Sequence, residues 1–576
     1  MAFMLRDHTL IPITRSLATA ISVIASEVFK RSFRSRYSND HVLIWIDQIC
    51  INQNDVIERQ NQVSLMPILY TKATNGIIWL GEEDIHSTHV TKMVKTINRE
   101  RYADHPKAEQ REALQQFLGK ESENGPNNDY EMSFLNLFSR PWFRRAWTFQ
   151  EAVLPGNVSF LIGQQCITLH ELLCMIETIG HGRVGRMLLR ARRHSKRAAE
   201  GYESLLAIAA TRYEISGEKS GREYMYFLSE LAPYFKATDA RDLCYAFLGF
   251  QKNSRIQIQP NYLLTVEEVF EHTSRAIIKG SSSLNIFGLL ARGSTQVLAA
   301  NLPSWAPDWS AEPLTVPLYG SHLEKQFSAC RNRRHRPVFD MLNTPETTFD
   351  HVNSYLITRH SLNPTGLWVR GKVIDIVDHI HSTTSFAHSP RQHFDIQDIN
   401  IQDLFDLHQI LRSIHLSWAT NEPMVSYERL LRTILANGVN PGDSEIILQR
   451  EASGGLYDWR LAEFIETYNE WQTIQTNVAN SRHYEAKLNA EALLAYGGVI
   501  KNRHVINTRH WRLGIAPNTV ANGDYVCILH GSNTPVILRA HASGAFRVVG
   551  QAYIEGIMHG EVVYWGEDEA EIFQLL

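Results

Sequence analysis

Two short apolar runs, one on each side of a helical segment, most constrain the fold of this chain. Residues 42–47 read VLIWID and residues 76–81 read GIIWLG, and both runs have the length of strands that are covered on both faces. Between them, Asp55 and Glu58 have the spacing of a helix start, and apolar residues then recur at helical intervals up to Ala73. Strand, helix and strand in this order predict a βαβ unit with two parallel strands.

Polar residues follow the first apolar run at once. Asp47 ends the strand expected over 42–47, and Asn52 and Gln53 come soon after it. Because open α/β sheets bind ligands at the carboxyl ends of their strands, these three residues are candidates for a binding site. Ordinary turn chemistry is the alternative, since Asp and Asn side chains commonly bond to the backbone of turns.

Composition excludes several classes of protein. A chain of 576 residues is too long for one core and predicts several domains. Its net charge of −4 argues against a general nucleic-acid binder. Six scattered cysteines without a CxxC pair predict reduced thiols and no metal site. No apolar stretch has the length of a membrane span, and no secretory signal is recognisable, so we expect a cytoplasmic protein without cofactors.

The predicted secondary structure differs between three regions that follow residue 165. Residues 166–300 read as helical and include a basic run at 183–197, which could bind an acidic partner, a phospholipid surface or an import receptor, or form a solvated helix face. Residues 301–500 read as mixed and mainly helical, with one strand expected at 367–377. Residues 501–576 read as a β-rich module, because DYVCILHG, PVILRA and FRVVGQAYIEGI are separated by turn residues.

Several blocks in a fixed order resemble the fungal heterokaryon incompatibility (HET) domain. They are LIWIDQICINQND, GIIWLG and RPWFRRAWTFQEAVLP, and ATDARDLCYAFLG, LPSWAPDWS and GDYVCILHGSNTPVILR resemble further parts of the longer family members. The resemblance implies non-self recognition when fungal cells fuse, programmed cell death triggered by the HET domain, and a protein partner or self-association.

The HET domain is similar to the TIR domain, so the resemblance implies a TIR/flavodoxin-like parallel sheet over residues 1–165. The family normally begins with a motif like Y-x-A-L-S-Y-x-W-G, which this sequence does not show before its WID block. We therefore expect either a sheet that lacks the usual first strand or a recorded start that lies downstream of the natural one.

Some TIR domains cleave NAD, and the spacing Trp147-x-x-x-Glu151 resembles the stretch that carries their catalytic glutamate. We expect one helix from Ser139 and Pro141 to Pro155, with Trp147 and Glu151 on one face. The resemblance then implies an NAD glycohydrolase in which Glu151 is catalytic, Asp47, Asn52, Gln53 and Trp147 line the site, and NAD is a substrate.

A carboxylate beside the ribose would stabilise the positive charge that develops on the sugar as nicotinamide leaves. Two alternatives stay open. Glu151 could instead pair with Arg144 or Arg145 and only fix the helix. The domain could also be a non-enzymatic signalling or scaffold module that self-associates.

Overall fold

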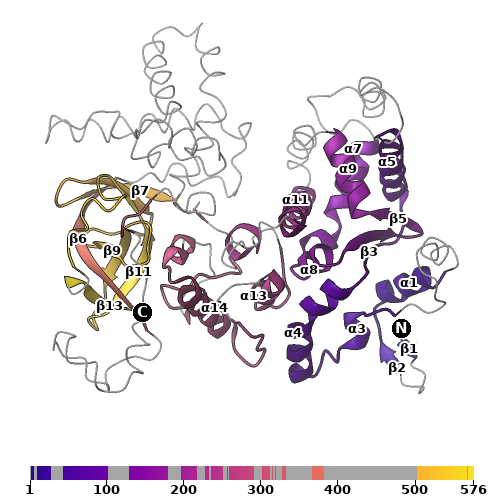
Figure 1. Cartoon of the computed structure of the whole chain (residues 1–576), viewed down its shortest axis with the longest axis horizontal. Coiled ribbons are helices and arrows are strands. Elements are labelled where there is room, and N and C mark those ends of the chain that lie inside the picture. The colour runs from indigo at the N-terminus through magenta and orange to yellow at the C-terminus, as the bar shows by residue number, and fades with distance from the viewer. Residues whose placement is uncertain are drawn as a thin grey trace, which may run out of the picture. The chain divides into compact units, whose positions relative to one another are not determined.

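The computed structural model describes residues 2–4, 10–26, 43–101, 129–179, 196–216, 227–232, 235–250, 256, 258–290, 301–311, 314–315, 318, 327–331, 366–381, 502–566 and 569–576 (Figure 1). The chain divides into two compact units. The first comprises Met1–Asn253 and Ile258–Val266, and the second comprises Ser254–Gln257 and Glu267–Leu576. Most of the basic run at 183–197 and most of the region 301–500 lie outside the described residues.

A small mixed sheet lies at the centre of the first unit. Its strand β3 (Asn75–Gly81) pairs in parallel with β4 (Asn157–Ile162), and β4 pairs antiparallel with β5 (Gln165–Thr168). The apolar side chains of β4 explain its central place, because every residue from 158 to 162 is buried. A separate hairpin joins β1 (Ala2–Met4) to β2 (Leu10–Pro12).

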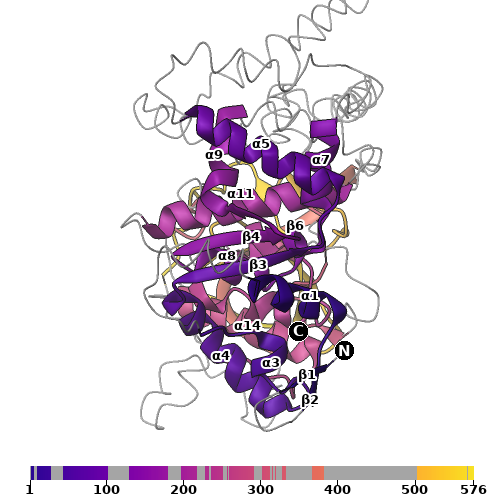
Figure 2. The same cartoon turned by 90° about the vertical axis from the view of Figure 1, so that its right-hand side faces the viewer.

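Helices cover the two sides of this sheet. Figures 1 and 2 show α5, α7 and α9 on one side of β3 and α3 and α4 on the other. The helices of the unit are α1 (Arg15–Ile24), α3 (Asp47–Cys50), α4 (Val56–Lys72), α5 (Ile85–Arg101), α7 (Asp129–Ser139), α8 (Thr148–Val153), α9 (Leu169–Ile179), α11 (Lys196–Ser216) and α13 (Asp242–Tyr245).

The strand expected over 42–47 is not formed by the residues that the structure describes there. Residues 43–46 have no regular structure, and Asp47 begins the single helical turn α3. Leu43 is fully exposed, so the run lacks the cover that a buried strand requires. The parallel partner of β3 is β4, because an apolar run specifies burial but does not specify which strand it pairs with. The helix α4 and the strand β3 lie where the sequence predicts them.

The long helix expected from residue 139 to residue 155 is also wrong. α7 ends at Ser139, a 3₁₀ turn covers Pro141–Arg144, and α8 begins only at Thr148. Between them Arg145 is extended, and the backbone N–H of Ala146 donates to the carbonyl of Lys236 at 2.9 Å. A backbone bridge to a distant segment therefore interrupts the helix that local sequence favours.

The second unit contains a closed barrel. Five strands form a ring in which β6 pairs with β9, β9 with β10, β10 with β11, β11 with β13, and β13 again with β6. Three further strands extend the sheet from β6 in the order β7, β8, β12. The strand bounds are β6 (Leu367–His381), β7 (Arg503–Thr508), β8 (Leu513–Pro517), β9 (Tyr525–Leu529), β10 (Val536–Ala540), β11 (Phe546–Gln551), β12 (Tyr553–Ile554) and β13 (Glu571–Leu575).

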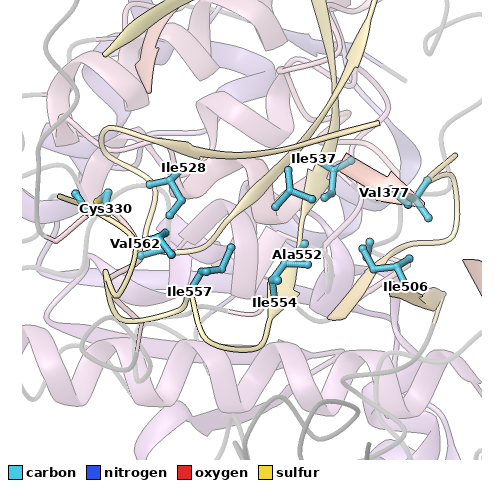
Figure 3. Close-up of a cluster of buried hydrophobic side chains, with 14 of the residues drawn as sticks. Cys330, Val377, Ile506, Ile528, Ile537, Ala552, Ile554, Ile557 and Val562 are labelled. Carbon is cyan, nitrogen blue, oxygen red and sulfur yellow. The ribbon is translucent and has the colours of Figure 1, made fainter. Parts of the chain in front are cut away.

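The long strand β6 closes the barrel by changing partners along its length. Gly371 pairs with Glu571 of β13 and with Leu529 of β9, so it stands where the two ladders meet. A Cβ atom at Gly371 would lie 2.3 Å from the carbonyl oxygen of Ile528, which means that only glycine permits this approach of the strands. Figure 3 shows the apolar core between the strands, where Ile506, Ile528, Ile537 and Ile554 are fully buried.

The strands that the sequence predicts in the last part of the chain are present as β9, β10, β11 and β12. The strand expected at 367–377 is β6, and it belongs to the same barrel although our division placed it in the preceding region. The second unit also contains the helix α14 (Val266–Ser281) and a 3₁₀ segment at Asn285–Leu289. None of the helices that the structure describes is both long and apolar enough to cross a bilayer.

Candidate functional site

The turn before α4 contains three of the predicted site residues, Asp47, Asn52 and Gln53. The backbone N–H of Asn52 donates to Oε1 of Glu58 at 2.9 Å, and its own amide oxygen accepts the N–H of Asn54. Nε2 of Gln53 donates to the backbone oxygen of Asp47 at 3.4 Å. Asn52 and Gln53 are exposed and hold the turn together, which is the alternative that turn chemistry predicts.

The start of α4 is fixed by its cap. The carboxylate of Asp55 accepts the N–H groups of Ile57 and Glu58 at 2.9 and 3.0 Å. Glu58 does not complete the reciprocal bond to Asp55 and instead bonds the turn at Asn52. The loop that carries Asp47 is therefore attached to the first turn of α4.

Glu151 lies on α8, and its carboxylate has one direct side-chain partner. Nε1 of Trp142 donates to Oε2 of Glu151 at 2.9 Å. The backbone of α8 reaches β3 closely here, because a Cβ atom on Gly76 would lie 3.0 Å from the carbonyl oxygen of Glu151. Trp142 itself is buried in an aromatic cluster with Phe143 and Phe160. The indole that orients the carboxylate is thus held by the core of the unit.

Asp47 and Glu151 come close enough to influence each other. Burial raises the pKa of Glu151, the charge of Arg145 and the hydrogen bond from Trp142 act in the opposite direction, and the charge of Asp47 raises it further. Burial also raises the pKa of Tyr70 on α4, and both Glu151 and Asp47 add to that effect. The fold therefore brings together two carboxylates, one phenol and one guanidinium at a single place.

The backbone of α8 approaches the sheet near the start of β3. The carbonyl oxygen of Glu151 lies beside Gly76, next to the first residue of β3, whereas the rule for open sheets points to the carboxyl end. At that carboxyl end, the guanidinium of Arg140 donates to the backbone oxygen of Leu80 at 2.8 Å and pairs with Asp84 at 3.2 Å. Because residues 43–46 have no regular structure, the expectation that Asp47 stands at the carboxyl end of a strand is wrong.

Trp147 has a different partner from Glu151. Its indole hydrogen-bonds the carboxylate of Asp242, whose pKa burial raises while the bonds from Tyr262 and Trp147 lower it. Trp142 therefore bonds Glu151, whereas Trp147 bonds Asp242. The W-x-x-x-E spacing therefore does not describe a contact between its two named side chains.

Sequence reasoning missed Arg212, which caps the carboxyl end of α8. Its guanidinium donates to the backbone oxygens of Ala152, Val153, Pro155 and Gly156, at distances from 2.7 to 3.1 Å. A cation at this end of a helix satisfies carbonyl groups that have no partner within the helix. No local signal could have indicated it, because Arg212 stands on α11, far away in sequence.

The chemistry of this region centres on the partly buried carboxyl group of Glu151. Glu151 can hold or release a proton, and Arg145 and the Trp142 indole stabilise its anionic form. Within the part of the chain that the structure describes, no three His, Cys, Asp or Glu side chains gather as a metal site. Among the described residues, none of the six cysteines is joined to another by a disulfide bond.

Two family models match this chain. Residues 4–151 match the heterokaryon incompatibility protein (HET) family, and residues 456–575 match the Het-6 beta-barrel domain. This chain is a HET-domain protein. It is 22% identical to heterokaryon incompatibility protein 6, OR allele, of Neurospora crassa, over 94% of this chain and 84% of the relative. No solved structure matches it.

The two matches differ from the units of the structure. The HET match ends at Glu151, whereas the compact unit that contains it continues to Asn253 and includes Ile258–Val266. The barrel match begins at residue 456, whereas the barrel also requires β6 at Leu367–His381. Both folded units of this HET-domain protein are therefore larger than the family models alone indicate.

Proposed function

We propose that this HET-domain protein is an effector of heterokaryon incompatibility, which arrests or kills fungal cells after the fusion of unlike partners. The observation that supports it is the order of the two modules along the chain. A HET match precedes a Het-6 barrel match, and similarity to a heterokaryon incompatibility protein extends over 94% of the sequence. A chance match to one short domain would not extend through both units.

The test is made in fusing fungal cells. A strain that produces the full chain is fused with a panel of strains, and fusion cells are scored for uptake of a vital dye. We expect some pairings to die and deletion of the gene to restore their viability. The proposal fails if deletion changes no pairing and if induced production of the chain leaves growth unchanged.

A second candidate is hydrolysis of NAD by the same unit, and the influence of the Asp47 charge on the pKa of Glu151 favours it. In this reaction, water replaces nicotinamide at the ribose, and the products are nicotinamide, ADP-ribose and a proton. Glu151 in its anionic form would stabilise the positive charge on the sugar, and Trp142 and Arg145 lower the pKa of Glu151 against the effect of its burial. A TIR-like arrangement of the sheet belongs to this candidate, and the approach of the α8 backbone to the start of β3 counts against it.

The enzymatic candidate is tested by incubating the purified chain with NAD and measuring nicotinamide. Glu151→Gln should abolish release, while Glu177→Gln, a change at an exposed glutamate on α9 of the same unit, should leave it unaffected. Equal release from both variants would remove Glu151 from the mechanism. If no nicotinamide is released and Glu151→Gln still kills cells, the non-enzymatic alternative, a self-associating signalling module, is favoured.

A further inference from the structure

The segment that follows the HET match contacts both helices of the candidate site. α4 carries Tyr70 and follows the Asp47 loop, and α8 carries Glu151. Residues 239–250 come about ninety positions later in the chain and lie outside residues 4–151, yet they belong to the same compact unit. Polar and aromatic contacts join this segment to the two helices.

On the side of α4, the contact is an ion pair reinforced by stacking. The guanidinium of Arg59 donates to Oδ2 of Asp239 at 3.0 Å and lies 3.6 Å over the ring of Tyr262. Asp239 also accepts two bonds from Arg241 at 2.8 Å, so one carboxylate joins two arginines. Arg241 in turn donates to the backbone oxygens of Tyr262 and Leu264.

On the side of α8, the contacts are buried. The indole of Trp147 bonds Asp242, and Nε2 of Gln150 donates to the carbonyl of Ala246 at 2.6 Å. The ring of Phe149 packs against those of Phe247 and Phe250 at centroid distances of 5.2 and 5.0 Å. Phe250 belongs to the 3₁₀ turn Leu248–Phe250, and this turn also contacts α4.

The two halves of these contacts are joined within the segment itself. The hydroxyl of Tyr262 donates to Oδ1 of Asp242 at 2.6 Å, and Arg59 stacks on the same ring. A displacement of α4 at Arg59 is therefore transmitted through Tyr262 and Asp242 to Trp147, at the start of α8. Hydrogen-bonded ionic groups of this kind have restricted geometry, which suits them to fixing a distance.

We propose that residues 239–250 and Tyr262 form a clamp that fixes α4 against α8, with Asp239 and Asp242 as positioning residues for the Asp47–Glu151 site. The functional unit then extends to about residue 266 and does not end with the family match at Glu151. The role of the clamp in cell killing rests on the proposed function, whereas its mechanical role does not.

The decisive experiment is hydrogen exchange, followed by mass spectrometry, on the full chain. Asp239→Ala removes the shared acceptor of Arg59 and Arg241, and Asp239→Glu restores the charge. Glu271→Ala is the matched control, because its pair with Arg275 has side-chain exposures of 19% and 27%, against 21% and 27% for Asp239 and Arg59. In Asp239→Ala we expect exchange in α4 and α8 to rise about tenfold, since both elements then open locally.

The exchange rate of the barrel peptides at 502–550 should stay the same in Asp239→Ala. The exchange rates of α4 and α8 should stay the same in Glu271→Ala and in Asp239→Glu. A rise confined to 239–250, or an equal rise in the control, would overturn the clamp. Trp147→Phe, which removes the indole N–H donor but keeps an aromatic ring, covers the case in which Asp239→Ala does not fold. We expect it to raise exchange in α8 about threefold, and no change there would also overturn the clamp.

Cell killing supplies the second measurement. If the wild-type chain kills fused cells, Asp239→Ala should not, and Asp239→Glu should. Killing that persists in Asp239→Ala despite faster exchange would overturn the positioning role. A wild-type chain that kills no cells would refute the proposed function, and exchange would still decide whether the clamp exists.

Discussion

The first compact unit contains the HET match, and we call it the HET unit. The HET unit and the barrel hold their strands by different means. In the HET unit, β3 and β5 each have one strand neighbour among the described residues, and side chains from distant segments complete the structure. Arg212, Arg140 and Asp239 each bond groups from other elements. In the barrel, five strands close into a ring through backbone ladders. Closure removes strand edges, so the barrel depends less on particular charged side chains.

The comparison indicates which kind of substitution destabilises each unit most. A ring of backbone bonds tolerates the loss of one polar side chain but not a backbone clash within the ring. In the HET unit, each of these guanidinium groups donates to several carbonyl or carboxylate oxygens. We therefore expect this unit to tolerate a change in a small apolar residue better than the loss of one guanidinium group. Four substitutions test this difference.

The largest effect is expected from Gly371→Ala in the barrel. Its Cβ would collide with the backbone oxygen of Ile528 at 2.3 Å, so β6 and β9 must separate. We expect a loss of about 3 kcal/mol or more in the free energy of unfolding, measured by chemical denaturation. Gly156→Ala is the control, since no atom lies within 4 Å of its added Cβ. Equal stability of the two variants would show that the barrel does not depend on this closure point.

Arg212→Met should give the next largest effect, in the HET unit. The substitution keeps the apolar stem and leaves four backbone oxygens at the end of α8 without their charged donor. We expect a loss of about 2–3 kcal/mol, with faster hydrogen exchange in α8. Arg197→Met, at an exposed position on the same helix, should cost little. A stable Arg212→Met variant would contradict the view that single guanidinium groups hold this unit.

The pH dependence of Glu151→Gln sharpens the comparison. Burial raises the pKa of Glu151 in the folded state, so the folded protein favours the protonated acid. The stability that this protonated form contributes is lost as the pH rises above the pKa of Glu151 in the unfolded chain. Glutamine has no proton to lose and can still accept the bond from Trp142. The variant should therefore match the wild type near pH 4 and exceed its melting temperature near pH 7. A wild type that is more stable at pH 7 would mean that Arg145 outweighs burial.

The smallest effect is expected from Lys196→Ala. Its ammonium lies 3.7 Å from Glu200, but the Lys196 side chain is 71% exposed, and Glu200 has a second partner in Arg144 at 3.2 Å. Solvent and salt screen such a pair, so we expect a loss of no more than about 0.5 kcal/mol. A loss above about 1 kcal/mol, abolished by high salt, would show that exposed charges also hold the HET unit.

Sequence patterns determined the elements that depend on local signals. Asp55 predicted the start of α4, GIIWLG predicted β3, and segments separated by turn residues predicted β9, β10 and β11. The ordered blocks also predicted the HET family. Caps, burial and turns act within a few residues, so a sequence read along its length reveals them.

Only the tertiary structure decided the pairing and the site. It gave β3 the partner β4 in place of residues 42–47, it broke the helix after Arg144 by a bridge to Lys236, and it paired Glu151 with Trp142 rather than Trp147. The first two outcomes depend on segments that are far apart in the chain, and the third joins residues on the two sides of the break in the helix. Local residue preferences are small compared with the free energy of such long-range contacts, which is why sequence alone could not predict them.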